Sequence, residues 1–177
     1  LPPSEAMAKL TAEADAEVAG DLLLRILLLR ILQMPPAFLE RLALHLLRAM
    51  GYGGKDSALE HTGKSGDAGL DGIVKQDALG LELVGMQAKR YAKDTAVQRP
   101  EVQAFVGALN GAQTSGGIFF TTGRFSAGAR EYADTVGMRL ILIDGPELTR
   151  LMVRYNVGVS IKESFHLTQI DDDFFDE

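Results

Sequence analysis

Two short apolar runs, each followed by a helical pattern, constrain the fold of this chain more than any other feature. Residues 117–121 (GIFFT) and 139–143 (RLILI) are too short for helices and have the composition of buried strands. Residues 126–136, with Ser126 as the N-cap, and residues 144–155 have the pattern of helices. Because strands that alternate with helices usually pair in parallel, this half of the chain predicts parallel strands.

The first half of the chain predicts a different arrangement. Helical patterns cover 36–50 and 99–112, each with a proline in its first turn. Between these helices lie a possible short strand at 58–62 and two strands, 71–75 and 81–90, around a turn near residues 78–80. This hairpin must be antiparallel. The sequence therefore predicts an α/β protein with a mixed central β-sheet flanked by helices.

Composition limits the class of protein further. The 177 residues suffice for one domain with a hydrophobic core, and they include no cysteine. A disulfide scaffold, a thiolate zinc site and a cysteine nucleophile are therefore excluded, and the composition suits a reducing cytoplasm. The leucine-rich run 22–32 has eleven residues where a bilayer span needs about 20, so we expect a soluble protein with no membrane partner. Because the chain begins with Leu1, we expect a fragment or a processed product.

Charge is distributed unevenly along the chain, whose formal net charge is −6. Acidic residues concentrate in 1–21 and 163–177, whereas 87–130 holds six bases and two acids. A basic middle region is compatible with a nucleic-acid partner, although charge patches are often only solvated faces.

The segments 66–74 (GDAGLDGIV) and 83–90 (LVGMQAKR) carry the residues that we single out for chemistry. Gln87 and Lys89 are two apart in a strand and project to one face, and a hairpin can bring Asp71 beside them. Phosphodiester hydrolysis needs a divalent cation, a positioned water and charge relief at the phosphate.

In this hypothesis Asp71 is the anionic metal ligand, and the Gln87 amide and the Ala88 carbonyl are neutral oxygen ligands. Lys89 holds or deprotonates the attacking water, or steadies the phosphate. Mg²⁺ suits such a set because it accepts a few oxygen ligands and keeps several waters, and Mn²⁺ is an alternative.

The same residues also have ordinary structural interpretations. Asp71 precedes a glycine, and Asp-Gly is common in turns. Lys89 alone is typical of a solvated strand. A glutamine and a lysine on one face of an otherwise apolar strand still require an explanation, so the joint pattern favours the catalytic interpretation.

Further candidates surround this set. Glu40, on the first predicted helix after the prolines, is either a carboxylate directed at the metal or an exposed helix residue favoured by the helix dipole. Arg90, Gln103, Thr121 and Thr122 are candidate DNA contacts. For Gln103 a polar helix surface is at least as good an interpretation, and for the two threonines an ordinary strand end is slightly preferred.

Taken together, these motifs resemble the Mrr-like restriction endonuclease family. The resemblance runs from about residue 36 to the C-terminus and rests on six segments: FLERLALHLLRAMGYGG (38–54), GDAGLDGIV (66–74), MQAKRY (86–91), RPEVQAFVGAL (99–109), GIFFTTGRFSAGAREYA (117–133) and ILIDGPELTRLMVRYNVGV (141–159). The family belongs to the PD-(D/E)xK nuclease superfamily, in a branch with Gln in place of the acidic residue. The resemblance implies that Asp71, Gln87 and Lys89 are the catalytic triplet and that Glu40 is the glutamate of the first core helix.

The resemblance also implies a function: a Mg²⁺-dependent, type IV-like restriction endodeoxyribonuclease that acts on methylated duplex DNA. Family members usually carry an N-terminal winged-helix DNA-binding domain. We therefore expect residues 1–35 to be a lead-in and leucine-rich helix that links to such a domain, and 36–177 to be the nuclease domain. Double-strand cleavage needs two active sites, so a homodimer is plausible, with 22–32 as a possible interface.

Two other functions stay open at this stage. Because Gln87 leaves the site with one anion fewer than usual, the chain could be a catalytically inactive DNA-binding or assembly module with the nuclease fold. A Holliday-junction or repair nuclease of the same superfamily is the third possibility.

Overall fold

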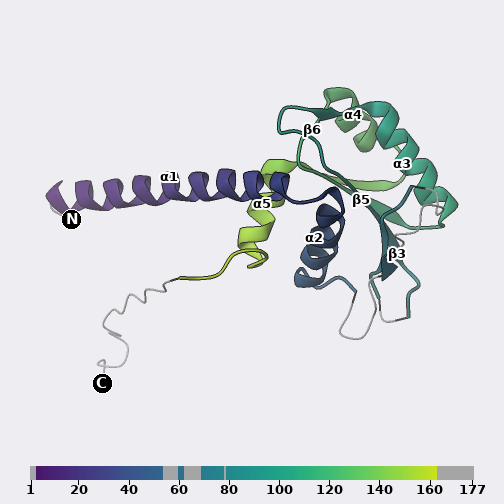
Figure 1. The fold of residues 1–177 in the computed structure, drawn as a ribbon, viewed down its shortest axis with the longest axis horizontal. Coiled ribbons are helices and arrows are strands. Elements are labelled where there is room, and N and C mark those ends of the chain that lie inside the picture. Colours follow the sequence, from purple (N-terminus) through teal and green to yellow (C-terminus); the bar gives the residue numbers. More distant parts are fainter. Residues whose placement is uncertain (1–2, 54–59, 62–68, 78, 163–177) are drawn as a thin grey trace, which may run out of the picture.

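The structure is a computed structural model that describes residues 3–53, 60–61, 69–77 and 79–162. Within these residues a five-stranded sheet forms the centre, and helices cover both of its faces (Figure 1). The helices are α1 (Pro3–Gln33), α2 (Pro36–Ala49), α3 (Arg99–Gly111), α4 (Ala127–Thr135) and α5 (Gly145–Arg154). The strands are β1 (Glu60–His61), β2 (Gly72–Lys75), β3 (Leu83–Lys89), β4 (Ala96–Val97), β5 (Gly116–Thr121), β6 (Arg124–Phe125) and β7 (Arg139–Ile143).

The central sheet has the strand order β1-β2-β3-β5-β7. β2 pairs with β3 in the antiparallel sense, and β3, β5 and β7 pair in parallel. Both the predicted hairpin and the predicted parallel half are therefore confirmed. The mixed sheet with helices on both faces also confirms the predicted α/β class.

Side chains of successive strand residues point to opposite faces of the sheet, so the interior is divided into two hydrophobic cores. One core lies between the sheet and the helices α1, α2 and α5, and its strand residues include Val84, Met86, Ile118 and Phe120. The other lies between the sheet and the helices α3 and α4. There Phe119 meets Phe105 and Phe125 edge-on, with ring centroids 5.1 Å and 5.5 Å apart, an arrangement that aromatic rings prefer.

Local sequence signals account for the starts of the later helices. The Ser126 hydroxyl accepts a hydrogen bond from the Ala129 N–H, which confirms Ser126 as the N-cap of α4. Asp144 caps α5 in the same way by accepting from the Glu147 N–H, and its second carboxylate oxygen accepts from Arg130. At the end of α2, Gly51 adopts a positive φ of 95°, a conformation that favours glycine after a helix.

The structure adds one element to the sequence-based expectation and gives the bounds of two others. The lead-in and the leucine-rich run form one continuous helix, α1, which projects from the rest of the molecule (Figure 1). β4 and β6 form a separate two-stranded parallel pair that the sequence pattern did not predict, because two-residue strands show no periodicity. Of the strand expected at 58–62, the described residues are Glu60 and His61, which form β1.

Parts of three segments named in the sequence analysis lie outside the described residues: 66–68 of the segment 66–74, residue 78 of the hairpin turn, and the acidic region 163–177. The described part of the turn is organised by Asp77, whose carboxylate accepts hydrogen bonds from the N–H groups of Leu79, Leu81 and Glu82. Among the helices described, none combines the length and the apolar character needed to cross a membrane.

The cap of α5 provides a test of this fold. Asp144→Ala removes the acceptor for the Glu147 N–H and the partner of Arg130, and we expect it to lower the free energy of unfolding by about 1 kcal/mol. Asp144→Asn is the matched control, because its amide oxygen can still cap the helix, and it should cost less. Urea unfolding followed by circular dichroism measures both. Equal losses would show that charge, and not the cap, is the stabilising contribution.

Candidate active site

The pairing of β2 with β3 places Asp71 beside Gln87. Gly72 lies opposite Met86 in the antiparallel register, and the Asp71 N–H donates to the Met86 carbonyl at 2.8 Å. Continuing the register by one residue puts Asp71 opposite Gln87. Because backbone groups alternate in direction along a strand, the Ala88 carbonyl faces the same side of β3 as the Met86 carbonyl. The three predicted oxygen donors therefore belong to one end of the hairpin.

The carboxylate of Asp71 continues the ladder where the backbone pairing stops. Its Oδ2 atom accepts a hydrogen bond of 2.7 Å from the Ala88 N–H, and the side chain is half-buried. A carboxylate held by a backbone N–H stays close to β3 and in a fixed orientation. A sequence interpretation of Asp71 as only a turn residue does not account for this contact.

Gln87 and Lys89 lie on the face of β3 that looks toward α3. Gly85 lies on the same face, because it is two residues before Gln87. A Cβ atom on Gly85 would lie 2.3 Å from a methyl group of Leu109 in α3. The Lys89 ammonium bonds the Glu101 carboxylate of α3 at 3.0 Å. Because Gln87 and Lys89 are two residues apart in β3, they share this face, as the sequence predicts. Both side chains are half-buried.

Glu101 is the residue near this site that the sequence analysis did not select. Its Oε1 atom accepts from both Lys89 and the hydroxyl of Tyr91, and its Oε2 atom accepts from the Gln98 N–H at 2.8 Å. The available signal was the helix start: an acidic residue in the first turn commonly bonds the N-cap backbone. That signal predicts the bond to Gln98 but not the contact with Lys89, which depends on how α3 packs on the sheet.

The electrostatics of this cluster favour an ionised Glu101. Partial burial by itself would raise the pKa of Glu101, but the hydrogen bonds from Gln98, Tyr91 and Lys89 and the charge of Lys89 together hold that pKa below its usual range. The hydrogen bond to Glu101, with partial burial, raises the pKa of Tyr91. Near neutral pH Glu101 is thus a carboxylate and Tyr91 a neutral phenol.

Three of the candidate DNA contacts make hydrogen bonds within the protein. The Arg90 guanidinium donates to the carbonyls of Leu32, in the last turn of α1, and Met34, just beyond it, at 3.1 and 2.7 Å. The buried Thr121 hydroxyl donates to the Lys89 carbonyl. The buried Thr122 side chain bonds both the N–H and the carbonyl of Tyr91. These threonines thus match the strand-end interpretation and fix the path of the chain after β3.

The other two candidates lie on helices. Gln103 is exposed on α3, two residues beyond Glu101. Glu40 is half-buried on α2, on the flank that it shares with Leu44 and Leu47, and α2 packs against β3. These contacts do not test a direct role of Glu40 at the metal, which stays a prediction.

The donor set is not one of clustered acids and histidines. Within the described ranges, no group of three or more His, Cys, Asp or Glu side chains is arranged to hold a metal ion. The set predicted here combines one carboxylate with an amide and a backbone carbonyl, all of them oxygen donors of the kind that Mg²⁺ accepts.

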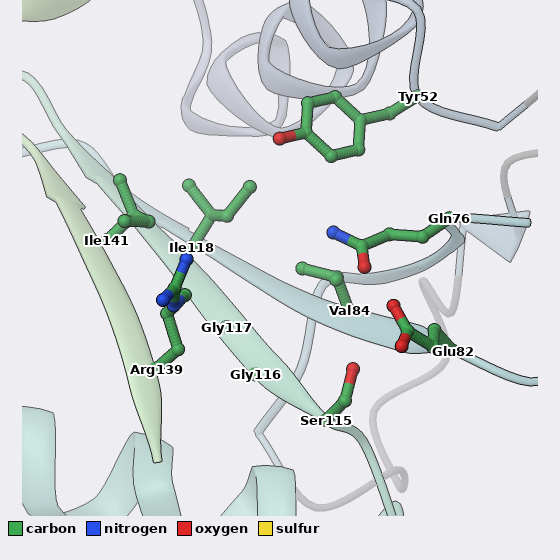
Figure 2. A pocket seen from close by; sticks show the side chains of 10 residues that line it. All are labelled: Tyr52, Gln76, Glu82, Val84, Ser115, Gly116, Gly117, Ile118, Arg139 and Ile141. Carbon is green, nitrogen blue, oxygen red and sulfur yellow. The ribbon is translucent and has the colours of Figure 1, made fainter.

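A cavity of about 390 Å³ lies at the other end of the parallel strands, away from Lys89. Figure 2 shows Val84 and Ile118 near its floor, with Tyr52 and Gln76 on one side and Arg139 on the other. Val84 stands near the start of β3, whereas Gln87 and Lys89 are near its end. The candidate active site is therefore not in this cavity.

The amino-acid sequence identifies the family of proteins to which this sheet and hairpin belong. The sequence profile of a restriction endonuclease family, Mrr_cat, matches residues 31–152, and the chain belongs to this family. Its structure resembles that of the DNA modification-dependent restriction endonuclease AspBHI, with a TM-score of 0.59 and 22% identity over 78% of this chain and 35% of that one. This likeness concerns the fold.

A curated relative is considerably more similar in sequence. The type IV methyl-directed restriction enzyme EcoKMrr of Escherichia coli (strain K12) is 42% identical over 147 residues. The match covers 82% of this chain and 47% of the relative, so the chain spans about half the length of that enzyme.

The ion pair of Lys89 with Glu101 has a pH signature. Because the folded-state pKa of Glu101 is lowered, its contribution to stability is present above the unfolded-state pKa of about 4.3 and is lost as the pH falls through the folded-state value. Glu101→Gln should lower the free energy of unfolding by about 1 kcal/mol at pH 7, and the difference from the wild type should shrink toward pH 3. Thermal unfolding across this pH range measures it. A difference that does not change with pH would contradict the assignment.

Proposed function

We propose that this chain is a divalent-metal-dependent endonuclease domain that hydrolyses phosphodiester bonds of DNA. The observation that carries the proposal is the Asp71 carboxylate, which bonds the Ala88 N–H next to Gln87, with Lys89 on the same strand two residues further. Family membership supports the class of reaction. The roles of the individual residues follow from their chemistry.

The donor atoms fit a hard cation such as Mg²⁺ or Mn²⁺. Asp71 would hold it with a charged oxygen, and Gln87 and Ala88 with neutral oxygens. When bound, such an ion relieves the negative charge that develops at the scissile phosphate. Glu40 is the proposed second carboxylate of the site.

Lys89 is the proposed positioning group for water or phosphate. Its ammonium can donate up to three hydrogen bonds, and Glu101 occupies one direction in the structure. Its other donors could turn toward a phosphate oxygen or a water molecule. Glu101, itself bonded by Tyr91 and Gln98, holds the ammonium in this orientation.

The proposed substrate is duplex DNA with methylated bases, by analogy with the methyl-directed relative. Arg90 and Gln103 remain candidate DNA contacts at the edge of the site, and Thr121 and Thr122 support the strand end behind it. We propose that 36–177 is the nuclease domain and that 1–35 connects it to a domain that reads the target. The start of the family match at residue 31 supports this boundary.

Asp71→Asn tests the metal ligand with little change in shape. The asparagine oxygen can still accept from the Ala88 N–H, so the hairpin should remain folded, but the anionic ligand is lost. Cleavage of methylated plasmid with Mg²⁺ should fall by about 100-fold or more. Wild-type cleavage should require the metal and should be weaker on unmethylated plasmid. Retention of cleavage in Asp71→Asn would contradict the assignment, and metal-independent DNA binding without cleavage in the wild type would favour the inactive module.

Lys89→Ala tests the role of the ammonium group. The single-turnover cleavage rate should fall by about 10²–10⁴-fold, while DNA affinity changes little. Lys93→Ala, in the exposed loop after β3, is the matched control for the loss of one positive charge and should cleave like the wild type. A loss of affinity with a normal single-turnover rate would make Lys89 only a phosphate contact.

A further inference from the structure

Helix α1 has two apolar stripes on opposite sides. Leu27, Leu28 and Ile31 are buried and belong to its inner side, where α1 contacts α5. Val18, Leu22, Ile26 and Leu29 form a second set, which we call the outer stripe. At about 100° per residue, the outer stripe spans an arc of about 80° whose centre is nearly opposite the buried residues.

The outer stripe is exposed over its whole length. Its side chains are between 49% and 68% exposed, and the helix projects from the rest of the molecule (Figure 1). The spacing of four, four and three residues is that of a helix that packs along another helix. Isolated exposed leucines are ordinary, but a continuous row on one helix face marks an interaction surface.

Charges beside the outer stripe identify the occupant. Asp21 and Arg25 lie on the same flank of the stripe, one turn apart. When two copies of α1 pair in the antiparallel sense about a point between residues 23 and 24, Val18 is level with Leu29 of the second copy, and Asp21 is close to the level of Arg25. Both contacts occur twice, so the surface is complementary to itself.

Other occupants fit less well. A membrane surface favours lysine and arginine on both flanks of the apolar face, whereas one flank of the outer stripe carries Asp21 beside Arg25. A parallel pair would place the Asp21 and Arg25 flanks of the two copies on opposite sides of the interface, so this charge complementarity would not be used. We propose that the outer stripe is an interface between two copies of this chain, paired antiparallel through α1.

The apolar contribution is tested with the double variant Leu22→Gln and Ile26→Gln. A single helix pair buries little area, so we expect a wild-type dimer with a dissociation constant in the micromolar range. The double variant should weaken dimerisation at least tenfold in sedimentation velocity across a concentration series. Leu79→Gln with Leu81→Gln is the matched control, because these leucines are 84% and 81% exposed on the hairpin turn, and it should dimerise normally. The proposal would be overturned if the wild type stayed monomeric at about 100 µM. It would also be overturned if the double variant dimerised as well as the wild type.

The charge contribution is tested with Asp21→Arg and Arg25→Asp in separate chains. Each variant alone places like charges across the interface and should be mainly monomeric. An equimolar mixture should form a heterodimer, because each arginine of one chain then meets an aspartate of the other. Since both residues are exposed, neither change disturbs the core. Equal association of the separate variants and their mixture would contradict the proposed contact.

Orientation is tested with engineered cysteines, since the chain has none of its own. In the antiparallel pair, Val18→Cys in one chain approaches Leu29→Cys in the other, whereas two Val18→Cys chains hold their sulfurs about 16 Å apart along the axis. Mild oxidation should therefore give a disulfide-linked dimer only from the mixture. A homodimer of Val18→Cys chains would indicate parallel pairing and overturn the proposal.

Discussion

Two hydrogen bonds between residue 71 and β3 determine the geometry of the candidate active site. The Asp71 N–H binds the Met86 carbonyl, and the Asp71 carboxylate binds the Ala88 N–H. Together they extend the antiparallel ladder by one residue and replace its next backbone acceptor with a charged side chain. The position of the carboxylate is therefore a consequence of strand register, because a slip by one residue would turn the side chains to the other face.

The second half of the site depends on packing between layers. Lys89 comes from the sheet and Glu101 from the first turn of α3, and their contact forms because α3 lies across the face that carries Gly85 and Gln87. Gly85 matters here because a side chain at that position would collide with Leu109. The ion pair thus reports the close approach of helix and sheet.

Much of the fold follows from local patterns. The hairpin, the parallel strands β5 and β7, and the cap at Ser126 are visible as period-two runs, alternation and an N-cap residue. The proximity of Asp71 to Gln87 also follows, because it needs only a hairpin. Glu101 and the bonds of Arg90 to the end of α1 could not be predicted, since 12 residues separate Glu101 from Lys89 and up to 58 residues separate Arg90 from its partners, and no periodicity encodes such contacts. Pairs as short as β4 and β6 carry no pattern at all.

The guanidinium of Arg90 connects the projecting helix α1 to the chain just after β3. It binds two carbonyls at the exit from α1 and sits one residue after Lys89. Hydrogen bonds weaken steeply when their geometry is distorted, so a tilt of α1 at its C-terminal end would either break these two bonds or displace the end of β3. The orientation of α1 is therefore coupled to the strand that carries Gln87 and Lys89, the residues proposed to act at the metal and the phosphate.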